Sequence, residues 1–263
     1  MHLHSCFKSL IYLSMLQIPQ VIAFTRLTRS KIYRSSLHTT NLTFSSKNTL
    51  ADNSLGEVKD RTYRWLKNTI IKLNFCPFAE KPLKKEKLSV IEFEGGNNDD
   101  EELCQIMLEE MMRLKDESGT SLIVAPKFFP DDFISFLSFI TEVESTVMED
   151  FELHGIIQIA PFHPNFCFDG NDIDDVDNFT NRSPYPTFHL LREDEVSRAV
   201  DSIDGDSGKV WKRNVRFLHN LESNLGRHNV EKAMNGEYVH GIEDILRDTK
   251  IDINSFYERM NDK

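Results

Sequence analysis

Aspartate and glutamate are absent from the first 51 residues of the chain, although this segment holds six basic residues and many serines and threonines. A segment without acids that carries arginine and serine has the composition of a transit peptide, so we exclude residues 1–51 from the fold. It contains an apolar run from Leu10 to Phe24, which Gln17, Pro19 and Gln20 interrupt. Since a membrane span needs about 20 apolar residues, this run predicts the apolar region of a signal peptide and no stable membrane insertion.

An apolar run followed by a basic tract rich in serine and threonine resembles the bipartite presequences of plastids that are enclosed by extra membranes. We therefore expect a plastid protein whose presequence is removed. A plain plastid or mitochondrial presequence is the alternative. A disordered tail without a targeting role would leave the complete absence of acids unexplained.

The rest of the chain is strongly acidic. The whole sequence has a net charge of −11, and six of its 31 basic residues belong to the first segment, so 25 face 42 acidic residues in the remainder. Such a charge repels phosphate backbones and anionic lipids, which argues against nucleic acid or membranes as partners and leaves small metabolites. The roughly 210 remaining residues are enough for one domain with a sizeable core.

Several familiar catalytic patterns are missing. The cysteines outside the first segment are Cys76, Cys104 and Cys167, an odd set without a CxxC pair, which argues against a disulfide framework and a structural zinc site. The sequence has no glycine-rich phosphate loop and no serine nucleophile elbow, and Gly95-Gly96 is typical of a turn. It therefore predicts no metal, leaves the identity of any cofactor unknown and carries no signal for an oligomeric state.

Apolar residues instead form strand-like and helix-like patterns along the body of the chain. The predicted strands cover 88–93, 121–125, 155–160 and 187–191, and the predicted helices cover 57–75, 99–114, 131–147, 193–203 and 209–225. A long polar loop, 161–185, precedes the last strand. Loops of this length inside a compact domain are commonly functional or disordered.

Strands that alternate with helices predict a βαβαβ core. We expect a small single-domain α/β sandwich with a mostly parallel sheet and a long loop before the last strand. The chain then divides into a targeting presequence (1–51), the α/β domain (52–226) and a C-terminal tail (227–263) that is helical in part.

Three motifs lie in this body: LNFCPFA at 73–79, FHP at 162–164 and NRSPYPTFHLLRE at 181–193. Pro184 and Pro186 fix the backbone on both sides of Tyr185, so the third motif is a rigid turn that carries polar side chains. In this order the motifs resemble the signature of the family catalogued as domain of unknown function 1415, over residues 65–226. The resemblance implies a fold unit and candidate residues but no reaction. Cys167 and the acidic run 172–177 lie outside its pattern.

Two of these motifs are expected to meet at one edge of the sheet, since ligands of open α/β sheets bind beyond the carboxyl ends of the strands. His163 follows the predicted strand 155–160, and Lys127 follows the predicted strand 121–125. If the strand 187–191 runs antiparallel to 155–160, its start brings Arg182 and Tyr185 to the same edge. Arg182, Lys127 and His163 would then form a basic patch on an acidic protein, which suits a small anion.

The leading hypothesis from the sequence is an organellar enzyme that acts on a small anionic metabolite, a carboxylate or a phosphate, by acid/base chemistry. Arg182 and Lys127 would bind the anion, and His163 would exchange the proton. Asn181 and Tyr185 would orient the substrate. The alternatives are a non-catalytic module that binds or senses a metabolite with the same patch, and a structural or assembly protein in which the motif folds the long loop.

Each of these residues also has a structural interpretation. Arg182 can clamp the long loop through backbone carbonyls, His163 can be a hydrogen-bonded turn residue, and Tyr185 can be a packing wedge. His189 shares a strand face with Thr187. This placement favours a hydrogen-bonded core histidine over the ligand contact that His189 could also provide.

Cys76 is a candidate nucleophile of a thiol hydrolase, with His163 as its base. It follows a predicted helix C-terminus, however, where the helix dipole disfavours the thiolate. Pro77 beside it favours a buried thiol. A metal site at His163, Cys167 and His189 is the weakest interpretation, because Cys167 lies outside the family pattern.

Overall fold

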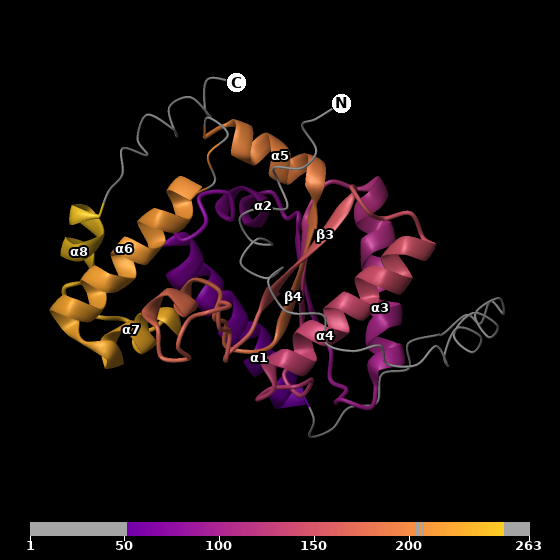
Figure 1. Cartoon of the computed structure of the whole chain (residues 1–263), viewed down its shortest axis with the longest axis horizontal. Coiled ribbons are helices and arrows are strands. Elements are labelled where there is room, and N and C mark those ends of the chain that lie inside the picture. The colour runs from indigo at the N-terminus through magenta and orange to yellow at the C-terminus, as the bar shows by residue number, and fades with distance from the viewer. Residues whose placement is uncertain (1–51, 204–205, 207, 250–263) are drawn as a thin grey trace.

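The computed structural model of the chain describes residues 52–203, 206 and 208–249. The predicted presequence 1–51 and the tail from residue 250 onward lie outside the described residues, so the plastid location stays a prediction. Within the described residues, four strands and eight α-helices form an α/β domain (Figure 1). The strands are β1 (Leu88–Glu92), β2 (Thr120–Val124), β3 (Ile157–Phe162) and β4 (Thr187–Arg192).

The helices follow the predicted pattern closely. Two short π-helices, Leu66–Ile71 and Glu144–Met148, extend the first and fourth α-helices, and a 3-10 helix, Val176–Thr180, lies within the long loop. The tail is helical at α7 (Arg227–Met234) and α8 (Ile242–Asp248), in agreement with its predicted partial helicity. The α-helices are α1 (Asp52–Trp65), α2 (Glu80–Lys84), α3 (Asp100–Asp116), α4 (Phe133–Val143), α5 (Glu193–Asp201), α6 (Gly208–Leu225), α7 (Arg227–Met234) and α8 (Ile242–Asp248).

The sheet is mixed, so the prediction of a mostly parallel sheet is wrong. The strand order is β1-β2-β4-β3, in which β1 and β2 are parallel and β4 is antiparallel to both of its neighbours. β1, β2 and β3 do run in one direction, as a βαβαβ core requires, but the connection through α4 leaves a gap between β2 and β3. The long loop returns the chain to the edge where β3 ends, and β4 fills the gap from there.

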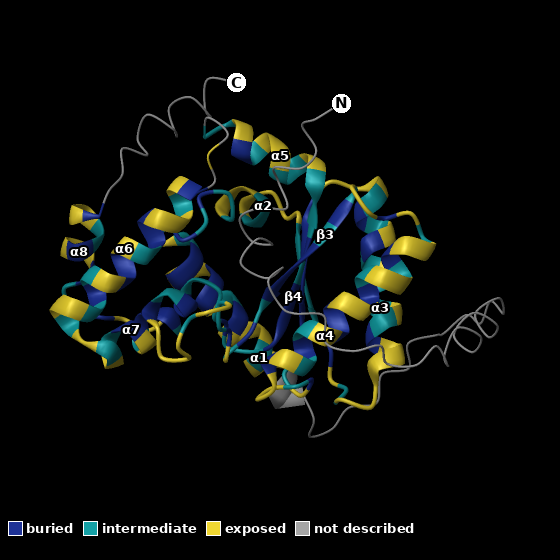
Figure 2. Cartoon of the chain, viewed as in Figure 1, coloured by how far each residue is buried: buried dark blue, intermediate teal, exposed yellow. Residues whose placement is uncertain are grey.

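One face of the sheet packs against α3 and α4. Ile123 of β2 and Phe188 and Leu190 of β4 are fully buried on this face, and the Phe188 ring lies 4.5 Å from that of Phe136 in α4. Figure 2 shows that both helices are buried on the side toward the sheet and exposed on the other. Each such apolar side chain contributes about 1.5–3 kcal/mol when it leaves water. α3 contributes an apolar stripe of Leu103, Met107, Met111 and Leu114.

A second hydrophobic core lies among the helices on the other side of the sheet. α1, α6, α7 and α8 all contribute to it, and Trp65 of α1 meets Phe162 of β3 edge-on at a centroid distance of 5.7 Å. The core residues from these elements and the segments between them include Leu66, Ile70, Leu73, Phe75, Phe217, Leu218, Leu221, Val230, Met234 and Ile245. The helical core therefore touches the sheet where β3 ends.

We call the side of the sheet that faces these helices the second sheet face. Because side chains alternate along a strand, this face carries the residues that do not enter the first core. β1 is half-buried along its whole length, and His189 of β4 is half-buried too. The second sheet face consists of Leu88, Val90, Glu92, Thr120, Leu122, Val124, Gln158, Ala160, Phe162, Thr187, His189 and Leu191.

The stretch 73–79 joins the first helices to α6. Asn74 has a positive φ of 57°, and Phe75 turns into the helical core, where its ring meets Phe217 at 5.8 Å. The Asn74 carbonyl accepts a hydrogen bond from Arg213 Nη1 at 3.2 Å, and the Phe75 carbonyl accepts one from Asn214 Nδ2 at 2.8 Å. Side chains of α6 thus donate hydrogen bonds to two carbonyls that follow the first helices. The LNFCPFA motif therefore has a structural role.

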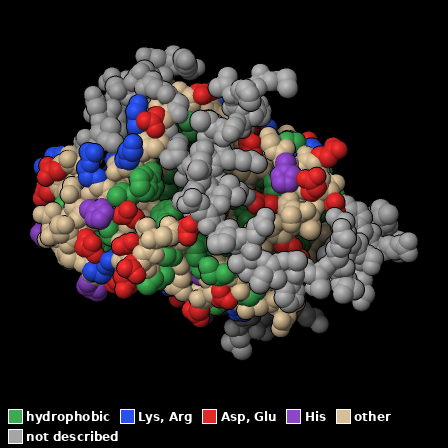
Figure 3. Space-filling view, viewed as in Figure 1, with side chains coloured by type: hydrophobic (Ala, Val, Ile, Leu, Met, Phe, Trp, Pro, Cys, Tyr) green, Lys and Arg blue, Asp and Glu red, His purple; other side chains and the backbone are tan. Residues whose placement is uncertain are grey.

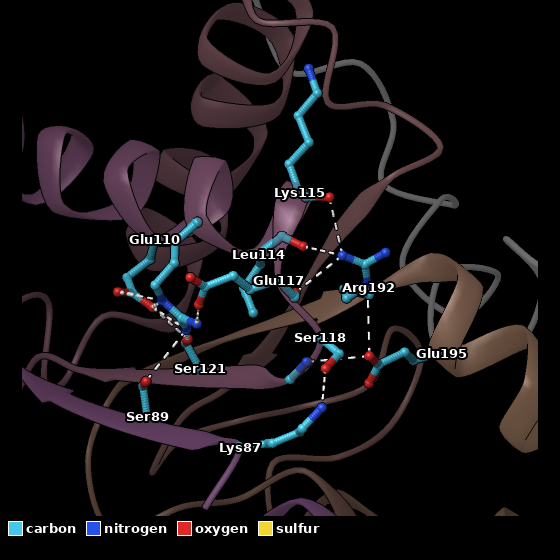
Figure 4. A network of polar contacts seen from close by, with 12 residues as sticks. Lys87, Ser89, Glu110, Leu114, Lys115, Glu117, Ser118, Ser121, Arg192 and Glu195 are labelled. Carbon is cyan, nitrogen blue, oxygen red and sulfur yellow. Dashed lines mark hydrogen bonds and ion pairs between the residues drawn. The ribbon is translucent and has the colours of Figure 1, made fainter.

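Arg192 closes the upper edge of the sheet, where β4 ends (Figure 4). Its Nη1 atom donates to the carbonyls of Leu114, Lys115 and Glu117 at 2.5, 3.1 and 3.1 Å, and its Nε atom pairs with Asp194 at 3.0 Å. These carbonyls belong to the end of α3 and the residue after it, where a helix leaves acceptors without partners. One guanidinium therefore ties β4 to α3.

Arg192→Ala is expected to destabilise the fold by about 2 kcal/mol, because the end of α3 loses a charged donor. Urea denaturation measures this loss. Arg198→Ala is the matched control, since Arg198 pairs with the same Asp194 but is 65% exposed, and its loss should stay within about 0.5 kcal/mol. Equal losses in the two variants would contradict the capping role of Arg192.

Candidate functional site

Three loops meet at the lower edge of the sheet in Figure 1, where β1, β2 and β3 end and β4 begins. Ala125, directly after β2, donates its backbone N–H to the carbonyl of Pro186 at 2.9 Å. His163, directly after β3, donates its backbone N–H to the carbonyl of Asn181 at 3.3 Å and contacts Phe129 through its ring. The structure thus brings together the segments that the sequence analysis placed at one edge.

His163 is completely buried, and both of its ring nitrogens are occupied. Nε2 donates to the Phe129 carbonyl at 2.9 Å, and Nδ1 accepts from the backbone N–H of Asn165 at 3.0 Å. The ring packs against Phe133 and Phe136 at centroid distances of 5.3 and 5.2 Å. Burial lowers the pKa of His163, so the neutral ring is favoured. These contacts hold the loops together and leave no ring nitrogen for a substrate.

Arg182 binds the long loop to which it belongs. Its Nε atom donates to the Phe166 carbonyl at 3.2 Å, and its Nη2 atom donates to the Ile173 carbonyl at 2.5 Å. The guanidinium lies 4.5 Å above the ring of Phe179. Next to it, the Asn181 side chain accepts a hydrogen bond from a threonine hydroxyl of the same loop at 3.1 Å. An anion would therefore have to share a guanidinium that already serves two carbonyls.

Tyr185 sits at the centre of the rigid turn. Its carbonyl accepts hydrogen bonds from the hydroxyls of Ser183 at 2.6 Å and Thr187 at 2.8 Å. Its ring lies 5.3 Å from the guanidinium of Arg61 in α1. The turn is thus fixed by its own side chains and reaches α1 through the tyrosine ring.

Three exposed cations lie near this edge: Lys59 and Arg61 of α1 and Lys127 after β2. Lys59 and Lys127 are close enough to Glu92 to favour its charged form, and Arg61 stacks on Tyr185. None of the three forms an ion pair with a carboxylate in the part of the chain that the structure describes. We call Lys59, Arg61, Lys127 and Glu92 the edge cluster.

Glu92 is a candidate that the sequence analysis missed. It ends β1 on the second sheet face, and its Oε2 atom is buried without a hydrogen-bond partner among the described residues. Burial raises the pKa of Glu92 and Glu94 raises it further, whereas Lys59 and Lys127 lower it. Such perturbed carboxyls are concentrated at functional sites. The available signal was a single acid at the end of the apolar strand LSVIE.

His189 lies in the middle of the second sheet face. Its Nε2 atom is 2.8 Å from the hydroxyl of Thr120 in β2. Burial lowers the pKa of His189 to about 4. The position therefore has the hydrogen-bonded, neutral histidine that the strand pattern favoured.

Cys76 packs at the border of the helical core. Burial raises the pKa of its thiol, although hydrogen bonds from the backbone of Phe78 and Ala79 lower it. No hydrogen bond joins Cys76 to His163 within the described ranges, and the pKa of Cys167 is raised by burial as well. Among the described residues, no group of three or more His, Cys, Asp or Glu side chains is placed to hold a metal ion. No helix in that part of the chain has the length and apolar character to cross a membrane.

A family model described as a protein of unknown function, DUF1415, matches residues 57–227. The match covers more than half of the chain and includes all three motifs. The chain belongs to the DUF1415 family. No curated protein and no solved structure matches the chain. The geometry shows what the DUF1415 motifs do in the fold: the first is bound by α6, and the second and third meet at the lower edge of the sheet.

Arg182→Ala is expected to destabilise this DUF1415 protein by about 2 kcal/mol, because the long loop loses two carbonyl hydrogen bonds and the stacking on Phe179. Urea denaturation measures the change. Lys127→Ala is the control, since this exposed side chain has no ion pair in the described residues, and its effect should stay within about 0.5 kcal/mol. An Arg182→Ala variant of full stability would show that the guanidinium does not clamp the loop.

Stability is expected to fall as the pH drops from about 6.5 toward 4. Folded His189 stays neutral down to a pKa of about 4, whereas the unfolded chain takes up that proton near pH 6.5. The unfolded state therefore binds more protons in this window. Because of His189, the free energy of unfolding falls by about 1.4 kcal/mol for each pH unit of acidification. Denaturation at several pH values should give a shallower slope for His189→Gln than for the wild type. The same slope in both proteins would contradict the lowered pKa of His189 in the folded state.

Proposed function

We propose that this DUF1415 protein is an enzyme that binds a small anionic metabolite, a carboxylate or a phosphate, at the edge cluster and exchanges a proton with it. The supporting observation is that Lys59, Arg61 and Lys127 are exposed near Glu92 and the rigid turn without ion pairs among the described residues. A cation that is not held in a close ion pair can bind an anion without first breaking one.

The charge of the rest of the protein favours a small ligand. Acidic side chains are spread over the visible face of the molecule in Figure 3, while Lys and Arg gather mainly over the upper part of α6. A long polyanion at the edge cluster would extend over a protein whose net charge is −11 and be repelled. A metabolite that contacts only the edge cluster avoids this repulsion.

The residues of the edge cluster take distinct roles in this proposal. Lys127 supplies a point charge, and Arg61 can bind a carboxylate or phosphate with two parallel hydrogen bonds. The ring of Tyr185 supports the Arg61 guanidinium from one face. Glu92 exchanges the proton, because its raised pKa brings it closer to neutral pH, where general acid/base catalysis is most efficient.

In this proposal His163 no longer exchanges the proton and Arg182 no longer binds the anion, in contrast to the hypothesis from the sequence. His163 and Arg182 are bonded to backbone atoms, which supports structural roles for both. A non-catalytic binding module is the second candidate function. The occupied nitrogens of His163 favour it, because they remove the expected histidine base from the site.

Lys127→Gln is expected to weaken anion binding roughly tenfold, because a charge-assisted hydrogen bond is lost. Melting of the full chain against phosphorylated metabolites and organic acids, at constant ionic strength, measures this. A bound anion at a hundredfold excess over its Kd stabilises the folded state by about 2.7 kcal/mol and raises Tm. Lys84→Gln is the matched control, because Lys84 is exposed but already pairs with Glu80. Anions that stabilise Lys127→Gln as well as the wild type, or stabilise neither, would refute the site.

The same anions test the catalytic part of the proposal through Glu92→Gln. This variant should retain binding and lose turnover by a factor of about 100 or more, since it cannot exchange a proton. Conversion of the bound anion is followed by NMR. A wild-type protein that binds the anion but leaves it unchanged would be the non-catalytic module.

A further inference from the structure

His189 is held in one tautomer by its neighbours. The Thr120 hydroxyl donates to the carbonyl of Leu190 at 2.7 Å and lies 2.8 Å from His189 Nε2. A hydroxyl has one proton to donate, so Nε2 must donate to the Thr120 oxygen. The other ring nitrogen, Nδ1, therefore carries a lone pair and no proton.

This lone pair has no hydrogen-bond partner in the described part of the chain, although the ring is half-buried. The ring is neutral at physiological pH, because burial holds its pKa at about 4. Phe162 lies 6.0 Å from the ring, and Leu122 is opposite His189 in the ladder. Nδ1 is not among the buried side-chain atoms that lack a partner in the described residues, so a donor from outside the protein can reach it.

His189 lies on the same sheet face as Glu92 of the edge cluster, two residues further along the strands from the lower edge. Glu92 is opposite Val124, and Val124 is opposite Thr187, which precedes His189 by two residues. Strand geometry places the backbones of Glu92 and His189 roughly 12 Å apart. Two side chains and a metabolite of a few carbons together have about the length of that separation.

We infer that the ligand of the edge cluster also carries a hydroxyl group, which donates a hydrogen bond to Nδ1 of His189. The inference rests on the proposed anion site and narrows its substrate class to hydroxycarboxylates and phosphorylated alcohols. A hydroxyl fits this position better than an ammonium group, because the apolar neighbours of His189 disfavour an unpaired charge. Thr120 acts as a positioning residue that keeps the lone pair on Nδ1.

Two pairs of probes test the inference on the full chain: L-malate against succinate, and glycerol 3-phosphate against methyl phosphate. In at least one pair the hydroxylated member should bind about tenfold more tightly, the equivalent of about 1.4 kcal/mol. His189→Phe and Thr120→Val should both abolish this preference. Thr120→Ser keeps the hydroxyl and should therefore show the same preference as the wild type. Lys127→Gln should weaken both members of the pair equally.

Ring nitrogen shifts of His189 give a second readout that does not depend on affinity. The free protein should show the Nε2–H tautomer, and the hydroxylated probe should shift the Nδ1 resonance toward that of a hydrogen-bonded acceptor, while its partner probe should not. Binding that depends on Lys127 but shows no preference and no Nδ1 shift would overturn this inference and leave the proposed anion site intact. Failure of all four probes to bind would overturn both.

Discussion

The imidazole of His163 is the contact on which the lower edge of the sheet depends. Its ring joins the loop after β2 to the start of the long loop, and its backbone N–H holds the segment that leads into β4. The loop after β2 and both ends of the long loop are thereby fixed by one buried residue. Because the ring is neutral and fully bonded, it can sit among phenylalanines without the cost of an unpaired polar group.

The polar residues of the motifs differ from those of the edge cluster in what they contact. His163, Arg182 and Arg192 all bind backbone carbonyls and position strands or loops. The residues left free lie outside the motif cores, on α1, at the end of β1 and after β2. A rigid edge of this kind is the support that a precisely oriented polar site requires.

Much of the fold could be predicted from the sequence, since apolar periodicity located the strands and the main helices. The position of β4 between β2 and β3 could not, because β4 has the same composition whichever strands it pairs with. The antiparallel direction that the site hypothesis assumed for 187–191 beside 155–160 is confirmed. Motif chemistry alone could not separate a clamp from a ligand contact at Arg182, since a guanidinium serves carbonyls and anions equally well. Glu92 was missed because its environment comes from residues far away in sequence, Lys59 and Lys127.

The position of β4 also has a consequence for the newly made chain. β4 lies inside the sheet, yet β1, β2 and β3 are all synthesised before it. Until residue 192 emerges, the inner edges of β2 and β3 lack the strand that finally pairs with both, and such edges recruit other strands. Translation of residues 163–192 takes roughly 1.5–6 s at common rates. During those seconds the nascent protein is prone to aggregation through two strand edges that the finished fold has paired.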